Sequence, residues 1–185
     1  MTTKLAIASD SHGNLAYMSQ FLEQIENHKP DLVYHLGDNY EDATCIIDKG
    51  YSLIRVPGTW SSYYQDYKID NRRIEEVEGW RLFLTHTPTQ DSHDRDDDPD
   101  PEEVCLLGKC DVMLHGHTHR PEVVHLSDLP HPVIRINPGH LKAATDRGYH
   151  PSYALIDLTI ESLHVKLIDL LSTNVIVDQQ FRKGS

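Results

Sequence analysis

Five short apolar runs of this sequence end in residues that can bind a metal ion, or in a turn where such a residue would be expected. The residues at these ends are Asp10-Ser11-His12, Gly37-Asp38, Pro57-Gly58-Thr59, His86 and Gly116-His117-Thr118-His119. Carboxylates and imidazoles without thiolates are typical ligands of Mn²⁺, Fe²⁺, Ni²⁺ or Zn²⁺ in an open catalytic site. Two such ions about 3.5–4 Å apart, bridged by a carboxylate such as Asp38, are the arrangement that cleaves phosphate esters.

The spacing within these motifs suits ligands that share one ion. In an extended segment, residues two apart point the same way, so the Asp-x-His motif at position 10 and the His-x-His motif at position 117 would each present two ligands to one side. Glycines at positions 13, 37, 58 and 116 allow tight turns with no Cβ beside the site. Each motif alone is also explained by a helix cap, a turn or a backbone-bonded histidine. The ordered set, with each member after a buried run, predicts one metal centre.

The runs that carry these motifs are predicted strands, and helical patterns separate them. Strands are predicted over residues 5–9, 32–36, 52–56, 80–85 and 112–115, and helices over residues 15–25, 42–49 and 101–107. Asn14 and Asp100 are predicted helix N-caps, with Pro101 at the first position of its helix. In an open α/β sheet, ligands collect outside the carboxyl ends of the strands, so these strand ends are expected to meet at one crevice.

The pattern changes in the second half of the chain. Residues 122–126, 132–137, 152–158 and 162–169 read as successive strands, the last two forming a hairpin around residues 159–161. An alternating half followed by a strand-rich half predicts an α/β fold with a mixed sheet rather than a purely doubly wound one. No repeat and no linker divides the chain, so residues 1–185 are predicted to form one domain.

Composition narrows the class of protein. The chain carries 17 Lys and Arg against 29 Asp and Glu, a formal charge of −12, which argues against a nucleic acid polymer as partner. This charge does not exclude a phosphate substrate, because bound cations reverse the charge of a pocket. No apolar run approaches the roughly 20 residues of a membrane-spanning helix. Three scattered cysteines indicate reduced thiols, and we expect a cytoplasmic protein. The sequence leaves open whether the chain forms a homo-oligomer.

Two segments stand apart from this pattern. Residues 91–103 contain eight acids and one arginine. A solvated, mobile loop is the favoured interpretation, and a flexible lip beside the site or an extra cation site is the alternative. Residues 181–185 are predicted to be a frayed tail.

The ligand motifs make the chain resemble the calcineurin-like metallophosphoesterase superfamily, and in particular its small bacterial and archaeal phosphodiesterase branch. Asn137-Pro138-Gly139 and residues 151–156 also resemble that branch, so the similarity spans nearly the whole chain. The resemblance implies a two-sheet αββα sandwich with a dinuclear metal centre of Mn, Fe, Ni or Zn at its edge. Carried over by position, one ion would take Asp10, His12, Asp38 and His119, and the other would share Asp38 and take His86 and His117.

The sequence departs from the family at the remaining ligand of the second ion. The family has an asparagine in a Gly-Asn-His/Cys-Asp/Glu motif, where this chain has Gly58-Thr59-Trp60-Ser61. A hydroxyl is a poorer ligand than an amide oxygen. Two interpretations follow: either Thr59, a water, Asn39 or Gln65 completes the coordination, or the second ion is held loosely and catalysis is poor. The other six protein ligands are intact, which favours an active enzyme.

The resemblance implies hydrolysis of a small phosphate ester, a phosphodiester above all, by a metal-activated hydroxide, with Asp38, His86 and His117 in the reacting centre. Because Trp60 stands where the family has a histidine or cysteine, no obvious residue protonates the leaving group. Esters with good leaving groups are therefore the favoured substrates. The alternative is a catalytically weak or inactive scaffold of the same fold, a metal-binding module for protein interaction.

Three polar residues are candidates for phosphate contact: Asn14, His140 and Arg147. Each also has an ordinary explanation. Asn14 would be a helix cap, His140 a turn residue after Asn137-Pro138-Gly139, and Arg147 a surface charge.

Overall fold

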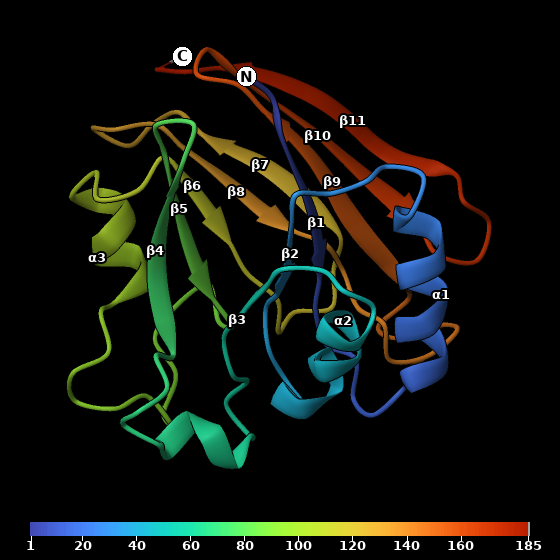
Figure 1. Cartoon of the computed structure of the whole chain (residues 1–185). Coiled ribbons are helices and arrows are strands. Elements are labelled where there is room, and N and C mark those ends of the chain that lie inside the picture. The colour runs from blue at the N-terminus through green and yellow to red at the C-terminus, as the bar shows by residue number, and fades with distance from the viewer. Residues whose placement is uncertain (185) are drawn as a thin grey trace.

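The structure, a computed structural model, describes residues 1–184 and contains two β-sheets packed face to face (Figure 1). The first sheet has the order β11-β10-β9-β1-β2-β3 and the second the order β4-β5-β6-β8-β7. The strands of the first sheet are β1 (Thr3–Ala8), β2 (Leu32–His35), β3 (Leu53–Arg55), β9 (Ser152–Leu158), β10 (Ser162–Asp169) and β11 (Val175–Arg182). Those of the second are β4 (Arg72–Val77), β5 (Trp80–Thr85), β6 (Val112–Leu114), β7 (Glu122–Leu126) and β8 (Val133–Asn137).

Helices cover the outer faces of both sheets. Helices α1 (Leu15–Ile25) and α2 (Thr44–Asp48) lie against the first sheet, and α3 (Pro101–Leu106) lies against the second (Figure 1). Two short 3₁₀ helices, η1 (Tyr40–Ala43) and η2 (Ser62–Gln65), lie in the connections. No helix among the described residues is long and apolar enough to cross a bilayer.

Three clusters of buried apolar side chains fill the spaces between these four layers. The largest joins the inner faces of the sheets and includes Ile7, Leu84 and Ile156. A second holds α1 on the first sheet through Phe21, and a third holds α3 on the second sheet through Val104. One apolar cluster for each layer contact is what stabilises a layered α/β domain. The predicted two-sheet αββα sandwich is therefore confirmed.

The helices begin where the sequence predicts. The Asn14 side chain accepts a hydrogen bond from the Tyr17 N–H, and the Asp100 side chain accepts from the N–H groups of Glu102 and Glu103. Each bond satisfies a backbone donor that the first turn of a helix leaves free. Pro101 occupies the first turn of α3, where its missing N–H costs nothing.

The strands that precede the ligand motifs run parallel within each sheet. β1 pairs in parallel with β2, and β2 with β3. In the second sheet β5 pairs in parallel with β6, and β6 with β8. Parallel strands end at the same edge, so both sheets deliver their carboxyl-terminal loops to the same end of the sandwich.

The sequence prediction fails at two strands and one tail. Strand β4 is not predicted, because burial does not follow hydrophobicity along it: Arg72 is buried while Ile74, on the same face, is 47% exposed. Strand β11 is not predicted because it is an edge strand whose side chains are mostly exposed. Phe181 and Arg182 pair with β10 as part of β11, so the predicted frayed tail does not begin at residue 181. Ser185, its last residue, lies outside the described residues.

The acidic segment is anchored. Asp94 accepts hydrogen bonds from the buried Arg72 guanidinium at 2.7 Å and from the Tyr64 hydroxyl at 2.6 Å. Asp98 accepts from the Asn71 amide at 2.7 Å. The interpretation of this stretch as a solvated, mobile loop is therefore wrong at Asp94 and Asp98, since side chains of the second sheet and of the segment before it hold both carboxylates.

Candidate metal centre

Four of the predicted ligands converge at the carboxyl ends of β1, β2 and β6. One ligand atom from each of them lies within 4.8 Å of the others, and the residues are Asp10, His12, Asp38 and His119. We call these four residues the first ligand group. Three of them are buried and His12 is exposed, so the group is open to solvent on the side of His12.

The atoms of this group crowd together in a way that a cation would relieve. The Nε2 atoms of His12 and His119 are 3.1 Å apart, and Nε2 of His119 is 3.2 Å from Oδ1 of Asp10. His12 Nε2 is also in direct contact with Oδ2 of Asp38. Two imidazole nitrogens and two carboxylates that meet at one point fit the ligand set of a divalent transition metal.

The second ligand group consists of His86, His117 and Thr59. The rings of His86 and His117 meet edge to face with centroids 5.2 Å apart, and Nε2 of His86 is 3.5 Å from Oδ1 of Asp38. The two oxygens of Asp38 thus face different histidines, His12 and His86, as a bridging carboxylate requires. His86 points into the cluster, as the sequence predicts.

One hydrogen bond of the His86 ring determines which of its nitrogens can bind a metal ion. Its Nδ1 lies 2.8 Å from the Leu36 carbonyl, which fixes the proton on Nδ1. Its Nε2 is buried and has no hydrogen-bond partner among the described residues. A buried acceptor without a partner costs free energy, so this nitrogen fits a metal ligand better than a packed side chain.

Thr59 is the weak member of the second ligand group. Its side chain is buried and its Oγ1 has no hydrogen-bond partner in the described chain. The Gly58 N–H donates to the Asp38 carbonyl at 3.3 Å, so the residue before Thr59 is in direct contact with the bridging residue. Of the other donors considered for this position, Gln65 gives its amide N–H to the His93 carbonyl at 2.7 Å, and Asn39 is exposed.

The ligands sit on strained backbone. Five of them have positive φ: Asp10, His12, Asp38, His117 and His119, with φ between 46° and 72°. Extended geometry, the basis for the predicted pairing of residues two apart, is therefore wrong, although the paired residues do converge. Left-handed conformations of residues other than glycine cost free energy and are concentrated at functional sites.

Two glycines leave room that any side chain would fill. A Cβ on Gly116 would lie 2.0 Å from Oγ of Ser9 and 2.5 Å from Oδ2 of Asp10. A Cβ on Gly58 would lie 2.3 Å from the Asp38 backbone nitrogen. The predicted role of these glycines in close backbone approach is confirmed at both positions.

Outer residues that the sequence analysis missed hold the ligands in place. Asp146 is in direct contact with Nδ1 of His119, so the Nε2 of His119 faces the cluster. Asp42 accepts from the Ser11 hydroxyl and the Gly13 N–H, both at 2.7 Å, and so fixes the turn that carries His12. Neither aspartate lies in a motif, and only the fold brings them to the centre.

The two groups differ in their electrostatics. Burial by itself raises the pKa of Asp10, but the hydrogen bond from His119 and the charge of His86 outweigh it, so the pKa lies well below its usual range. Burial lowers the pKa of His119, but Asp10 and Asp146 outweigh burial and raise it. Burial and the charge of His86 lower the pKa of His117. The first ligand group is therefore the more negative of the two.

The three predicted phosphate contacts lie in different settings. The Asn14 side chain is engaged by two backbone groups, the Tyr17 N–H and the Lys142 carbonyl. His140 is fully buried, with its ring centroid 5.5 Å from that of His119. Arg147 is 58% exposed, and its guanidinium donates to the Thr118 carbonyl at 3.2 Å, beside the ligand loop. Phosphate contact by these residues stays a prediction, and Arg147 is the best placed.

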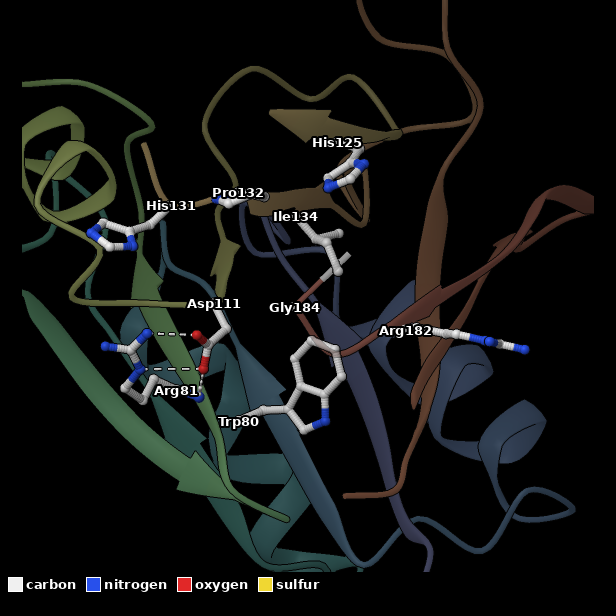
Figure 2. Close-up of a pocket in the computed structure, with 9 residues that line it drawn as sticks. All are labelled: Trp80, Arg81, Asp111, His125, His131, Pro132, Ile134, Arg182 and Gly184. Carbon is white, nitrogen blue, oxygen red and sulfur yellow. Dashed lines mark hydrogen bonds and ion pairs between the residues drawn. The ribbon is translucent and has the colours of Figure 1, made fainter. Parts of the chain in front are cut away.

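A separate hollow of about 150 Å³ lies near the opposite end of β5, where Trp80 and Arg81 begin the strand (Figure 2). Two of its charged residues satisfy each other, since the Arg81 guanidinium holds both oxygens of Asp111 at 2.6 and 3.2 Å (Figure 2). This hollow has none of the metal ligands and does not compete with the centre described above.

A two-sheet sandwich that gathers carboxylates and imidazoles at the ends of its strands defines a metal-binding protein of the α/β class. Residues 3–161 match the family profile of the calcineurin-like phosphoesterase superfamily domain. The chain belongs to this superfamily. A relative from Mycoplasma pneumoniae, described as a probable metallophosphoesterase, is 26% identical over 161 residues, which cover 85% of this chain and 91% of the relative.

Solved structures share the fold. Vacuolar Protein Sorting 29 from Cryptosporidium parvum superposes with a TM-score of 0.73 and 18% identity, covering 98% of this chain and 99% of that one. Yfce, a phosphoesterase from E. coli, superposes with a TM-score of 0.65 and 22% identity, covering 96% of this chain and 98% of that one. At these identities the likeness concerns the fold alone.

Proposed function

We propose that this protein is a metal-dependent phosphoesterase that hydrolyses a small phosphate ester, a phosphodiester in preference to a monoester. The observation that carries the proposal is the meeting of the two ligand groups at Asp38, one oxygen of which contacts His12 while the other lies 3.5 Å from His86. A carboxylate in this position can serve two ions at once. Membership in the phosphoesterase superfamily supports the same reaction.

The first ligand group would hold one ion, and His86, His117 and Asp38 would hold the second, with Thr59 as a weak additional donor. Bound here, two divalent ions of Mn, Fe, Ni or Zn would supply a hydroxide near neutral pH and positive charge for the phosphate oxygens. Asp146 and the Leu36 carbonyl orient the imidazoles of His119 and His86, so neither histidine has to reorganise during the reaction.

The remaining residues of the site would position the ester. Arg147 lies beside the His117 loop, where its guanidinium donates to the Thr118 carbonyl, and its exposed side chain would turn to a phosphate oxygen. The His117 N–H donates to both oxygens of Asp10 at 3.0 and 3.1 Å, which ties the second sheet to the first across the site. This bond keeps the two ligand groups at a fixed separation, which an in-line displacement at phosphorus requires.

A metal-binding scaffold for protein interaction is the second candidate. The replacement of the family asparagine by Thr59 favours it, because a loosely held second ion would leave the fold intact and the reaction slow. The likeness in fold to Vacuolar Protein Sorting 29 is in keeping with this candidate.

Metal content and hydrolysis, measured on one sample, separate the two candidates. The purified protein is loaded with Mn²⁺ or Ni²⁺, desalted, analysed for bound metal and assayed with bis-p-nitrophenyl phosphate and p-nitrophenyl phosphate. The proposal expects two equivalents of metal and faster cleavage of the diester. One equivalent without hydrolysis supports the scaffold, and failure to cleave either ester contradicts the proposed reaction.

A further inference from the structure

Trp60 occupies the position where the family has a histidine or cysteine, yet an imidazole lies against it. The ring of His93 packs on the Trp60 indole with centroids 4.4 Å apart. His93 comes from the loop after β5, which begins at the ligand His86, whereas Trp60 follows Thr59. Two segments that each start from the second ligand group thus meet at this pair of rings.

We propose that His93 is the general acid that protonates the leaving-group oxygen, and that Asp91 is the positioning residue that holds its ring. The inference rests on the phosphoester hydrolysis proposed above. Trp60 cannot provide a proton, and in this proposal the proton donor comes from a different segment of the chain.

The first argument is that the ring of His93 is held in one orientation. Its Nδ1 lies 2.7 Å from Oδ1 of Asp91, and the same oxygen accepts the His93 backbone N–H at 2.9 Å. The His93 carbonyl accepts the Gln65 amide N–H at 2.7 Å, which fastens the loop to η2. With both its backbone and Nδ1 fixed, the ring is oriented before any ester arrives.

The second argument is that Asp91 is itself held in place by a buried ion pair. Its backbone N–H donates to Oδ2 of Asp94 at 2.9 Å, and that carboxylate is held by the Arg72 guanidinium, whose side chain is 1% exposed. Such a buried charge pair keeps its geometry because breaking it would leave an unpaired buried charge. The acidic loop therefore acts as a rigid support for His93.

The third argument is that the free nitrogen is available to a substrate. Nδ1 faces the Asp91 carboxylate, so Nε2 is the nitrogen left to face a substrate. The His93 side chain is 36% exposed, and the described residues give Nε2 no hydrogen-bond partner. The ring contact with Trp60, the residue after Thr59, places the pair beside the second ligand group.

The proton balance of the step is simple. A hydroxide derived from water forms the new P–O bond, and the P–O bond to the leaving group breaks with its electron pair on the leaving oxygen. The proton on Nε2 of the imidazolium moves to that oxygen and releases an alcohol. The neutral imidazole then takes a proton from water, so the reaction consumes only the ester and water.

The test compares leaving groups. Wild type, His93→Gln and Asp91→Asn are assayed with methyl aryl phosphates whose leaving phenols range from strongly to weakly acidic. General acids typically contribute 10²–10⁴-fold, so His93→Gln should lose roughly 100-fold or more with the weakly acidic phenol and under about 3-fold with p-nitrophenol. His164→Gln is the matched control, because His164 is also part-exposed and paired with an aspartate, 2.6 Å from Asp178, at the other end of the sandwich.

A nitrogen-15 spectrum of the His93 ring gives a readout that does not depend on turnover. Wild type should show the neutral ring protonated at Nδ1, and Asp91→Asn should lose this preference while its melting temperature and metal content stay unchanged. Equal losses of rate across all leaving groups, or no loss, would overturn the assignment of His93 and leave the hydrolysis standing. Absence of hydrolysis in metal-loaded wild type would overturn both.

Discussion

The two ligand groups of the centre are built from the same chemistry but are not equally complete. In the first, two carboxylates and two imidazoles converge within 4.8 Å, and Asp146 supports His119 from outside. In the second, two imidazoles share Asp38 with the first group, and the remaining donor is the neutral hydroxyl of Thr59. The first group therefore has more negative charge than the second, and an additional aspartate orients one of its histidines.

This difference indicates an order of metal affinity. Cation binding follows the number of charged ligands and the orientation that outer partners impose on them. The pKa of His119 is raised by its two aspartates, after burial has opposed them, whereas burial and His86 lower the pKa of His117. The first ligand group thus attracts positive charge, while the second relies on Asp38 alone. We expect the first ion to bind more tightly than the second.

Asp38→Asn gives the largest expected effect, because it removes the only carboxylate that the two groups share. Asparagine tolerates the positive φ of 72° at this position, so the backbone is preserved. Since loss of an outer partner alone typically costs 10–100-fold in metal affinity, loss of this ligand should lower activity by more than about 100-fold. Metal analysis should show the second ion absent and the first weakened. Retention of two equivalents would contradict the bridging role.

Asp146→Asn tests the outer support of the first group alone. The change leaves all ligands in place but weakens the hold on Nδ1 of His119, so the affinity of the first ion should fall by about 10–100-fold. Competition with a chelating dye measures this affinity. Asp178→Asn is the control, because Asp178 also binds a histidine, His164, but far from the centre. If both variants lose affinity equally, support by Asp146 is not the cause.

Two substitutions of Thr59 test the incomplete group. Thr59→Asn restores an amide oxygen and should raise the affinity of the second ion by about 10-fold, with a matching rise in rate at low metal concentration. Thr59→Val removes the hydroxyl at nearly constant volume. Because Oγ1 is buried without a partner, the valine should leave the metal-free protein as stable or more stable, by about 1 kcal/mol.

Titration of the second equivalent by calorimetry distinguishes the outcomes at this position. A weaker second ion in Thr59→Val would make Thr59 a ligand. No change in either variant would mean that the loop does not reach the ion, and the alignment of this loop with the family motif would then be wrong.

Sequence patterns predict the first ligand group well because its members follow strongly apolar strands. β1, β2 and β6 are buried, so their ends are easily located, and the motifs Asp-x-His and His-x-His mark their ligands. β5, β7, β9 and β10 also begin and end at predicted residues. The helix predicted over residues 42–49 is instead the end of η1 followed by the shorter α2.

The supporting residues were beyond sequence reasoning for a physical reason. Asp146 reaches the centre from the loop between β8 and β9, where it contacts His119, and an isolated aspartate has no periodic signal. Strand β4 lacks a clear pattern because its outer face carries Arg72, which is buried through its ion pair with Asp94 of the acidic segment. Polar groups that are buried in pairs break the hydrophobic pattern on which the prediction depends.

The smallest expected effect is on the pH dependence of stability in the metal-free protein. Without metal ions, the interaction of His119 with Asp146 depends on whether His119 carries a proton. The folded-state pKa of His119 is raised, so its interaction with Asp146 stabilises the fold below the unfolded pKa of 6.5 and is lost as pH rises through the folded value. The folded-state pKa of Asp146 is lowered, so the same interaction is also lost as pH falls through that lower value.

Urea unfolding in the presence of a chelator measures this interaction as the difference in stability between wild type and Asp146→Asn. The difference should shrink as the pH rises from 6.5 through the raised pKa of His119, and pairs with a part-exposed member seldom exceed about 1 kcal/mol. Burial lowers the pKa of His35 and His115 to about 4, but these residues titrate alike in both proteins and cancel. A difference that grows with pH would mean that His119 is neutral in the metal-free fold, and the electrostatic contrast between the two ligand groups would then be wrong.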